Sequence, residues 1–293
     1  MARCVISVPG STSNFAHGFD SMGAAVSLRN RIVVTTGNSD GLSGTDDLVA
    51  FATPVHAACC ERWGSLPGIH IEVEGEVPRS RGLGSSATVY LGLCAALQQL
   101  AGRELDRGEL IRLALGWEGH PDNLVAAALG GFTIAGPVNG DLHWQRFALP
   151  ERLAAVVAIP DHSQLTSEAR GVLPQQLPRD EAIRAWQRAA MIAAAFASED
   201  HAGLRGLFDD AWHERHRAGM NPGLLAAREA AVAAGAYGAF LSGSGSTVLA
   251  LVDAAHQDSV ASALEASYAT AGIPCAVQAC AFDNDGLIVS ESP

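Results

Sequence analysis

Residues 78–87 read PRSRGLGSSA, and this short segment is the most informative in the chain. The strand predicted over residues 69–77 ends at Pro78, glycines then allow close backbone approach, and an apolar helix is predicted over residues 86–100. The free N–H groups and the dipole of such a helix start bind anions without a side-chain cation. Two interpretations follow: a phosphate-binding loop whose serine hydroxyl ligates Mg²⁺, or a plain strand-to-helix turn with a serine N-cap.

The basic residues of the chain are all arginines, and this narrows its chemistry. The 293 residues include 19 Lys plus Arg against 31 Asp plus Glu, a net charge of −12, and no lysine occurs. The chain therefore has no Walker-A lysine, no protein-kinase β3 lysine and no Schiff-base lysine. A GC-rich coding sequence would explain the missing lysines, but the exclusions hold whatever the cause. The acidic balance also argues against a nucleic-acid partner.

Composition and length indicate a globular protein with a sizeable core. Hydrophobic residues make up 48% and charged residues 17% of the chain, which is long enough for one large domain or two of ordinary size. Two charge-free stretches, residues 82–102 and 230–252, are interrupted by Gly and Ser and are predicted to be buried core instead of membrane spans. The six cysteines show no C-x-x-C pair, and residues 1–9 lack signal-peptide features. We therefore expect a cytoplasmic protein with no membrane partner.

Strands and helices alternate along both halves of the chain. In the first half we expect strands near 4–8, 26–35, 69–77, 133 and 142–147, and helices near 54–62, 86–100, 106–117 and 123–129. After Pro150 the pattern restarts, with strands near 154–159, 236–241, 247–252, 276–282 and 287–289, and helices near 179–197, 201–217, 222–234 and 257–271. This pattern predicts an α+β protein with two domains, residues 1–150 and 151–293.

Three further segments carry polar residues suited to chemistry. Residues 9–23 form a predicted loop rich in Gly, Ser and Asn whose polar groups have no obvious capping role. Residues 117–123 read WEGHPDN, in which the glutamate could hold a metal and the histidine and asparagine a substrate; the alternative is an ordinary helix start at Pro-Asp. Residues 241–247 form a Gly/Ser loop that lacks the third glycine of a dinucleotide-binding fingerprint, and a flexible hairpin also explains it.

A fourth segment resembles a zinc-binding motif without matching its spacing. Residues 213–216 read HERH, whereas zincin chemistry needs histidines four positions apart and a further ligand. We therefore expect a solvated helix face there. Neither serine loop has the spacing of a nucleophile elbow, so no serine-hydrolase chemistry is predicted.

Taken together, the segments resemble the GHMP small-molecule kinases, and most of all the homoserine kinases within that family. The resemblance covers nearly the whole chain and rests on residues 9–23 (PGSTSNFAHGFDSMG), 78–87 (PRSRGLGSSA), 118–123 (EGHPDN), 166–174 (TSEARGVLP) and 238–247 (GAFLSGSGST). It implies an α+β fold of two domains. The first would resemble domain 2 of ribosomal protein S5, with a left-handed β-α-β unit, and the second would be ferredoxin-like.

The resemblance also implies functional residues. The ATP phosphates would lie on Arg81, Gly82, Leu83, Gly84, Ser85, Ser86 and Ala87, and Mg²⁺ would be held by Ser86 and Glu118. The amino-acid substrate would contact Asn14, Asp20, His120, Asn123, Thr166, Arg170 and Arg217. The residues expected to act on the reaction itself are Ser86, Asn123 and Arg170. Arginine forks suit the substrate carboxylate, an aspartate suits its ammonium group, and an asparagine can orient the hydroxyl.

The reaction implied is ATP- and Mg²⁺-dependent phosphorylation of the L-homoserine hydroxyl, a step that feeds threonine synthesis. The γ-phosphate itself would accept the hydroxyl proton without a side-chain base, and Asp122 beside Asn123 is expected to support the helix start. We expect a homodimer that acts on a small molecule. Two alternatives stay open: a kinase of the same family acting on another small hydroxylated metabolite, and a ligand sensor of the same fold without turnover.

The sequence departs from the family pattern at three places. Ala16-His17 stand where Gly-Pro is common, Ser246 replaces a proline, and Gly10 replaces an alanine. We expect His17 to reshape the substrate pocket, so the sequence constrains the type of reaction more than the identity of the amino-acid alcohol.

Overall fold

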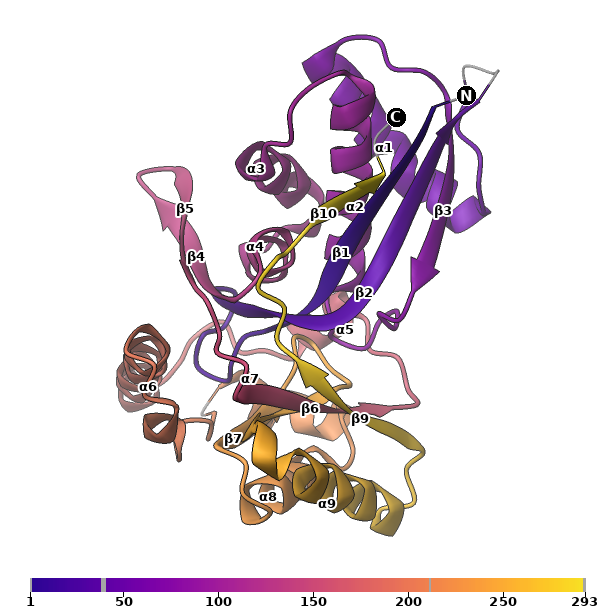
Figure 1. Cartoon of the computed structure of the whole chain (residues 1–293). Coiled ribbons are helices and arrows are strands. Elements are labelled where there is room, and N and C mark those ends of the chain that lie inside the picture. The colour runs from indigo at the N-terminus through magenta and orange to yellow at the C-terminus, as the bar shows by residue number, and fades with distance from the viewer. Residues whose placement is uncertain (1, 38–40, 211, 292–293) are drawn as a thin grey trace.

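The structure, a computed structural model, describes residues 2–37, 41–210 and 212–291. It contains two antiparallel sheets, each with helices packed on one face, and Figure 1 shows one sheet above the other. This arrangement confirms the predicted α+β class with two domains.

The first sheet has the strand order β10-β1-β2-β4-β5, and β3 also pairs with β2. Its strands are β1 (Arg3–Ser13), β2 (Met22–Thr36), β3 (Ile69–Gly75), β4 (Phe132–Val138), β5 (Asp141–Phe147) and β10 (Ile288–Glu291). One face is covered by α1 (Asp46–Trp63), α2 (Ser85–Leu100), α3 (Arg107–Glu118) and α4 (Pro121–Leu129). Strand side chains such as Ile6, Ile32 and Ile71 share one buried core with α2, and burial of this apolar area stabilises the helix layer.

The second sheet has the strand order β7-β8-β6-β9. Its strands are β6 (Leu153–Pro160), β7 (Gly238–Leu241), β8 (Val248–Asp253) and β9 (Cys275–Ala281), and its outer face is covered by α8 (Leu224–Ala233) and α9 (Gln257–Thr270). Because strand side chains alternate, Val156 of β6 packs with these helices and Val157 with the core toward the first sheet. The strand order is that of a ferredoxin-like β-α-β-β-α-β unit, as the resemblance implied.

The chain crosses between the two sheets twice. It passes from the first sheet to the second between β5 and β6, and it returns between β9 and β10 (Figure 1). β10 lies antiparallel beside β1, with Val5 opposite Glu291. We therefore propose the division expected near residue 150 as the domain boundary, with β10 as the strand that returns to the first sheet.

An apolar core fills the space between the sheets, and the loop after β1 is part of it. Phe15 of this loop is fully buried, and its ring centroid lies 5.1 Å from that of Phe132, 5.6 Å from Phe196 and 4.8 Å from Phe240. These rings come from β4, from α6 (Arg179–Ala197) and from β7. Both halves of the chain therefore fix the loop after β1 in place.

Between β6 and β7 the chain forms α5 (Thr166–Gly171), α6, α7 (His213–Arg217) and α8. Short 3₁₀ turns occur at His201–Leu204, Ala218–Met220 and Ala254–His256. The prediction of one continuous helix over residues 201–217 is therefore wrong. Gly206, with φ of 77°, lies in the left-handed region and interrupts the helical pattern.

Two other predicted boundaries are also wrong. β1 continues to Ser13 and β2 begins at Met22, so the loop predicted over residues 9–23 is much shorter. α1 begins at Asp46, because acidic residues favour a helix start there, and Pro54 lies inside the helix. Within the described ranges, no helix is both long enough and apolar enough to cross a membrane.

Candidate active site

A cleft of about 480 Å³ opens between the start of α2, the loop after β1, α5 and the β7–β8 turn. It brings together most of the residues predicted for nucleotide, metal and substrate, namely Asn14, Asp20, Arg81, Gly82, Gly84, Ser85, Ser86, Glu118, His120, Asn123, Thr166, Arg170 and Arg217. Leu83 and Ala87 do not line the described walls, because their side chains are buried in the apolar cores. Only the backbone of these two residues is available to a phosphate.

The loop before α2 presents backbone N–H groups to the cleft. The carbonyls of residues 81–83 accept hydrogen bonds of 2.6 to 3.1 Å from Ser11, Ser242 and Thr247. In a trans peptide the N–H points opposite to the carbonyl, so the N–H groups of residues 82–84 point away from these partners. Within the described chain, none of the three N–H groups donates a hydrogen bond. With the start of α2, they form a nest for an anion.

Gly82 and Gly84 are needed for this geometry. Both lie in the left-handed region, with φ of 75° and 67°. A Cβ on Gly82 would lie 2.0 Å from the Ser242 carbonyl oxygen, and one on Gly84 would lie 2.4 Å from Ser11 Oγ. The N-cap of α2 is Gly84, which makes no side-chain capping bond, so the alternative of a serine N-cap is wrong.

Ser86 and Glu118 form the part of the cleft suited to a cation. Ser86 Oγ donates a hydrogen bond to Glu118 Oε1 at 2.9 Å, and burial raises the pKa of this carboxyl group. No group of three or more His, Cys, Asp or Glu side chains that could hold a metal occurs among the described residues. Mg²⁺ usually takes one or two protein oxygens together with phosphates, so a hydroxyl and a carboxylate fit this ion. A bound cation would also favour the ionised form of the buried carboxylate.

The loop of residues 14–21 forms another wall and has an unusual backbone. Residues 14–16 have φ of 74°, 43° and 58°, and Asp20 has φ of 57°. Non-glycine residues in this region cost about 1–3 kcal/mol each, so surrounding contacts must hold them. The Asn14 side chain supplies two such contacts: its Oδ1 accepts from Asp20 N at 3.1 Å, and its Nδ2 donates to the Gly243 carbonyl at 2.8 Å.

Two arginines and one aspartate place opposite charges close together in the cleft. Arg170 donates to both oxygens of the Asp20 carboxylate, at 2.8 and 3.1 Å. The guanidinium of Arg217, a residue only 2% exposed, lies 5.3 Å from the Phe19 ring, and that of Arg170 lies at the same distance. Burial lowers the pKa of Arg217 to about 10, so this side chain stays cationic at neutral pH. Such a set matches the carboxylate and ammonium groups of a free amino acid.

Asn123 is held by two serines of β1. Its Oδ1 accepts from Ser11 Oγ at 2.9 Å, and its Nδ2 donates to Ser13 Oγ at 3.1 Å. Neighbouring Asp122 is buried and accepts a hydrogen bond from Asn123 N at 2.7 Å, and burial raises the pKa of its carboxyl group to about 7. Sequence reasoning missed the roles of the two serines. The sequence did contain a signal for these roles, because Ser11 and Ser13 belong to residues 9–23, whose polar groups had no obvious capping role.

Two predicted substrate residues stand at helix starts. Thr166 begins α5, and its Oγ1 lies 3.5 Å from Ser244 Oγ in the β7–β8 turn. His120 is the N-cap residue of α4 and forms no side-chain capping bond. Burial lowers the pKa of His120, so its imidazole is neutral at pH 7 and can accept or donate a hydrogen bond.

An aromatic wall completes the cleft beside Ser86, and sequence reasoning missed it. The rings of Phe51 and Tyr90 are stacked with centroids 4.0 Å apart, and Trp117 is stacked on Tyr90 at 5.7 Å. The three residues come from α1, α2 and α3, so no local spacing could have identified the group. A flat aromatic surface next to an anion nest suits the base of a nucleotide.

The residues that depart from the family pattern are not among the described cleft lining, although Ala16 and His17 belong to the loop that forms one wall. His17 is absent from the described cleft lining; its Nε2 hydrogen-bonds the Asp209 carbonyl at 3.0 Å, and burial lowers its pKa to about 4. Ser246 is buried and donates from Oγ to the His162 carbonyl at 2.7 Å. His17 therefore does not line the cleft directly, and its effect on the substrate pocket, through the loop that carries Asn14 and Asp20, stays a prediction.

Comparison with known proteins agrees with this geometry. The sequence matches the family GHMP kinases N terminal domain over residues 43–131 and the family GHMP kinases C terminal over residues 192–270. A homoserine kinase of Microchaete diplosiphon is 36% identical over 98% of this chain and 97% of its own length. One of Desulfitobacterium hafniense is 30% identical over 97% and 99%, respectively. The crystal structure of homoserine kinase from Cytophaga hutchinsonii has a TM-score of 0.89 at 24% identity, covering 98% of this chain and 97% of that chain. The chain therefore belongs to the GHMP kinase family and, within it, to the homoserine kinases.

Proposed function

We propose that the protein transfers the γ-phosphate of ATP to the hydroxyl group of L-homoserine, which yields O-phospho-L-homoserine for threonine synthesis. The observation that carries this proposal is one cleft in which an amide-lined anion nest adjoins paired cationic and anionic side chains. The nest suits a polyphosphate, and the charge pairs suit a free amino acid. Relatives named homoserine kinase, 30% and 36% identical over nearly the whole chain, support the same reaction.

The amino acid would bind through three groups. Its carboxylate would pair with the guanidinium groups of Arg170 and Arg217, and its ammonium group would pair with the Asp20 carboxylate. Its hydroxyl group would then face the Asn123 amide, which two β1 serines hold in one orientation. The ion pair between Asp20 and Arg170 holds both charges at the cleft before substrate arrives.

The nucleotide would lie along the start of α2. The N–H groups of residues 82–84 would contact its phosphates, and Arg81, which lines the cleft, would add a cationic side chain. Ser86 and Glu118 would hold Mg²⁺, which neutralises phosphate charge when it is bound. We place the adenine ring against the aromatic wall that contains Tyr90.

We propose direct transfer without a side-chain base. The amide of Asn123 cannot accept a proton, so an oxygen of the γ-phosphate takes the proton of the hydroxyl group. Asp122 is the alternative base, because it lines the cleft and its pKa, raised by burial to about 7, lies in the useful range. Its carboxylate, however, already accepts the N–H of Asn123 at the first turn of α4, and this favours a supporting role.

One assay tests the reaction against its alternatives. ADP release is measured with Mg²⁺-ATP and each of homoserine, threonine, serine and mevalonate. We expect the highest kcat/KM with L-homoserine. Preference for another compound would indicate a family member with a different alcohol substrate. No ADP release with any compound, together with ligand binding measured by calorimetry, would indicate a sensor.

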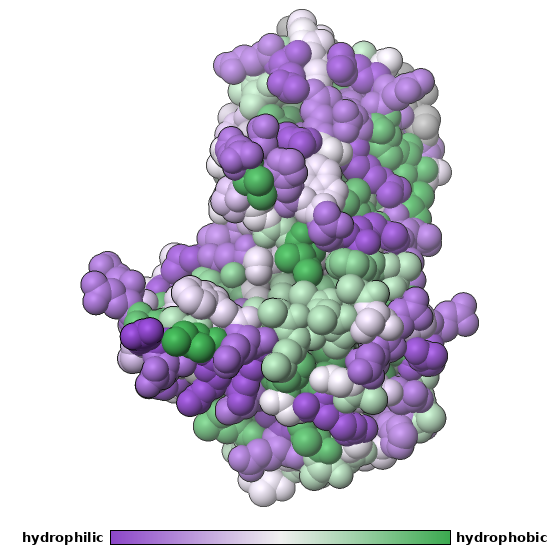
Figure 2. Space-filling view, turned by 90° about the vertical axis from the view of Figure 1, so that its left-hand side faces the viewer, coloured by the Kyte–Doolittle hydropathy of each residue, from purple (hydrophilic) through white to green (hydrophobic). Residues whose placement is uncertain are grey.

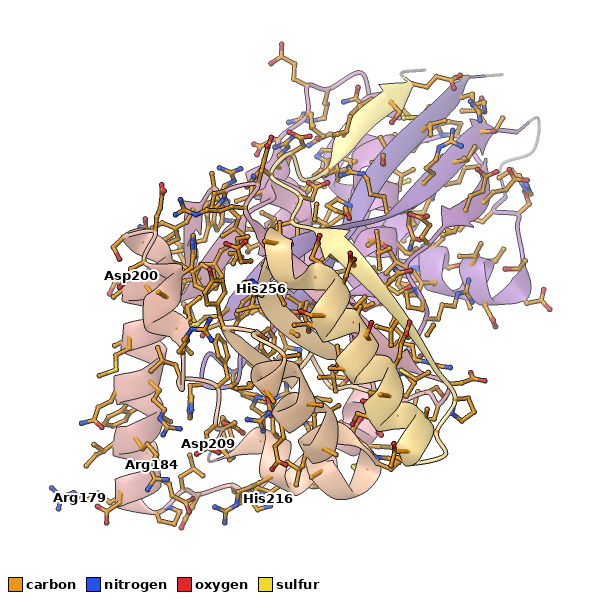
Figure 3. The ribbon with its side chains drawn as sticks, turned by 60° about the horizontal axis from the view of Figure 1, so that its bottom comes forward. Arg179, Arg184, Asp200, Asp209, His216 and His256 are labelled. Atoms are coloured by element: carbon orange, nitrogen blue, oxygen red, sulfur yellow. The ribbon has the colours of Figure 1, made fainter. Side chains whose placement is uncertain are left out.

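We also propose that two copies associate through α6. Its exposed face carries Ile183, Trp186 and Met191, which are 36%, 73% and 56% exposed. In Figure 2, which shows the side on which α6 lies, mostly pale green surface occupies the middle of the lower half, with purple surface on both sides. Arg179 and Asp200 lie at opposite ends of this helix (Figure 3), so an antiparallel pair would bring opposite charges together. Light scattering should give a dimer mass for the wild type and a monomer mass for Trp186→Glu; an unchanged mass would exclude this face.

A cytoplasmic location is proposed on different grounds. All six cysteines are free thiols, and a reducing compartment keeps them so. The phosphate donor and the amino acid are both small cytoplasmic metabolites in this proposal. Fractionation of cells that express the full chain, followed by immunodetection, tests the location directly.

A further inference from the structure

The HERH segment of residues 213–216 does not form the solvated helix face expected of it. It begins α7, and the imidazole of His213 is fully buried, whereas His216 is partly exposed. No part of the reaction described so far uses His213. Its surroundings nevertheless connect the two sides of the proposed amino-acid site.

Side-chain contacts hold α7, the helix that carries His213, in place. Glu214 N donates to Asp210 Oδ2 at 2.7 Å, and Glu214 Oε1 accepts from Leu241 N of β7 at 2.9 Å. The second carboxylate oxygen of Glu214 pairs with Arg228 of α8 at 2.8 Å. These contacts anchor α7 to the second sheet and its helix layer, so a group projecting from α7 has little freedom to move.

His213 uses both ring nitrogens. Its Nε2 donates a hydrogen bond to the Ala16 carbonyl at 2.8 Å, and its Nδ1 accepts a longer one from Arg217 NH1 at 3.4 Å. A carbonyl can only accept and a guanidinium can only donate, so the neutral Nε2–H tautomer satisfies both partners. Burial and the neighbouring Arg217 lower the pKa of His213, which keeps the ring neutral.

Arg217 is held on its other sides by backbone carbonyls. Its Nε donates to Ala169 O at 3.0 Å, and its NH1 donates to Gly243 O at 3.1 Å. The Gly243 carbonyl also accepts from Asn14 Nδ2 at 2.8 Å. One shared carbonyl therefore joins Arg217 to the loop of residues 14–21, and His213 provides the second connection.

The loop needs such connections because its own backbone does not favour its shape. Residues 14–16 are all left-handed, and the His213 bond acts on the last of them. The His213 ring also contacts the Phe19 ring, with centroids 5.2 Å apart, directly before Asp20. His213 thus contacts the loop that leads to Asp20, and it also contacts Arg217.

We propose that His213 is a positioning residue that sets the distance between the ammonium site at Asp20 and the carboxylate site at Arg217. This inference rests on the proposed homoserine kinase function. Both charged groups of an α-amino acid are attached to one carbon, so two fixed sites direct the third substituent toward Asn123 and the phosphate nest. The D-enantiomer cannot satisfy all three sites together. His213 therefore governs the preference for L-homoserine.

The test compares steady-state rates with L-homoserine and D-homoserine at saturating Mg²⁺-ATP. His213→Ala should raise the KM for L-homoserine by about tenfold or more, because it frees a charged group and the loop that faces it. It should lower the L-over-D ratio of kcat/KM by a similar factor. The KM for ATP should stay within about twofold of the wild-type value, because none of the contacts described for the His213 side chain reaches the nucleotide nest.

Two conservative variants separate the two connections. Glutamine can place an N–H near the position of Nε2 and so retain the bond to Ala16. Asparagine can place an oxygen near the position of Nδ1 and so retain the bond from Arg217. We expect intermediate L-over-D ratios for both. His216→Ala is the matched control, because His216 lies on the same helix (Figure 3) and its side chain has no hydrogen bond or ion pair described within residues 2–37, 41–210 and 212–291.

The outcomes are distinct. An unchanged L-over-D ratio and an unchanged KM for L-homoserine in His213→Ala would overturn the inference. A parallel rise of both KM values with a lowered thermal midpoint would mean that His213 only stabilises the fold. If the alanine variant does not fold, the glutamine and asparagine variants decide by the same ratio. A wild-type protein without activity on homoserine would instead contradict the proposed function.

Discussion

The loop of residues 78–84 and the loop of residues 14–21 line the same cleft, but they are built by opposite means. The first has glycines, Gly82 and Gly84, at two of its three left-handed positions, with Ser80 at the third, and it offers backbone N–H groups. The second places non-glycine residues in the left-handed region and offers side chains. The first needs free space, because any Cβ at residue 82 would meet another segment. The second needs contacts, because its backbone would relax without them.

This difference separates two kinds of recognition. A nest of backbone N–H groups binds any phosphate group, and a short local sequence is enough to encode it. A site for one amino acid needs several charges at fixed distances, and those charges come from α5, α7 and the loop after β1. Changes in the first loop should therefore affect the nucleotide, and changes in the second region should affect the amino acid.

Gly82→Ala should damage the nucleotide side most strongly. The new Cβ would lie 2.0 Å from the Ser242 carbonyl, and the residue would have to keep φ of 75°. We expect kcat/KM for ATP to fall by about 100-fold or more, because displacement of the nest by about 1 Å misplaces the phosphates. Gly140→Ala is the control: Gly140 has φ of 88°, but its Cβ would meet open space. Equal losses in the two variants would contradict the clash as the cause.

Arg170→Ala should damage the amino-acid side selectively. It removes a guanidinium that makes two bonds to Asp20 and that we assign to the substrate carboxylate. We expect the KM for L-homoserine to rise by about 100-fold, with the KM for ATP nearly unchanged. Arg170→Lys should recover only part of the loss, because an ammonium cannot form the two-pronged contact. An unchanged KM for homoserine would remove Arg170 from the carboxylate site.

Tyr90→Leu should affect the nucleotide side by a smaller amount. Tyr90 stands between Phe51 and Trp117 in the aromatic wall, and its loss removes a stacking surface. We expect the KM for ATP to rise by about tenfold, while the KM for homoserine stays the same. Tyr237→Leu is the matched control, because Tyr237 does not belong to the described cleft lining. If homoserine binding weakens instead, the wall belongs to the amino-acid site.

Asp122→Asn should have the smallest effect on the rate, because it keeps the side-chain oxygen that accepts the N–H of Asn123. We expect activity within about tenfold of wild type, whereas loss of a true general base costs about 100-fold or more. The Asp122 pKa rises from 3.8 to about 7 on burial, so the folded state disfavours its ionised form and loses stability as pH rises toward 7. Asp122→Asn has no ionisable carboxyl group at this position, so the variant does not lose stability in this way. The melting temperature of the variant should therefore exceed that of the wild type by a margin that grows between about pH 4 and pH 7 and levels off above this range.

The sequence predicted the geometry of the loop before α2 well and the geometry of the proposed amino-acid site less well, for a physical reason. Residues 78–87 contain the glycines and the helix start that make the nest, so a local pattern is sufficient. Arg170 and Arg217 were reached only through resemblance, because no spacing within the chain pairs them with Asp20. His213 was misjudged as solvated, since its acceptor at Ala16 lies 197 positions away in the sequence. The wall of Phe51 and Tyr90 was missed because its rings come from separate helices.

The pairing of β10 with β1 has a consequence for how the molecule assembles. Arg3 and Glu291 form an ion pair across these strands although 288 positions separate them in the sequence. Contacts of such separation carry a large loop-closure entropy and form only after shorter-range structure has shortened the effective loop. The ferredoxin-like unit between residues 153 and 281 supplies this shortening. During synthesis the first sheet therefore remains open at β1 until the second sheet has formed. In hydrogen exchange, the amides of β10 should be among the first of the sheet to lose protection.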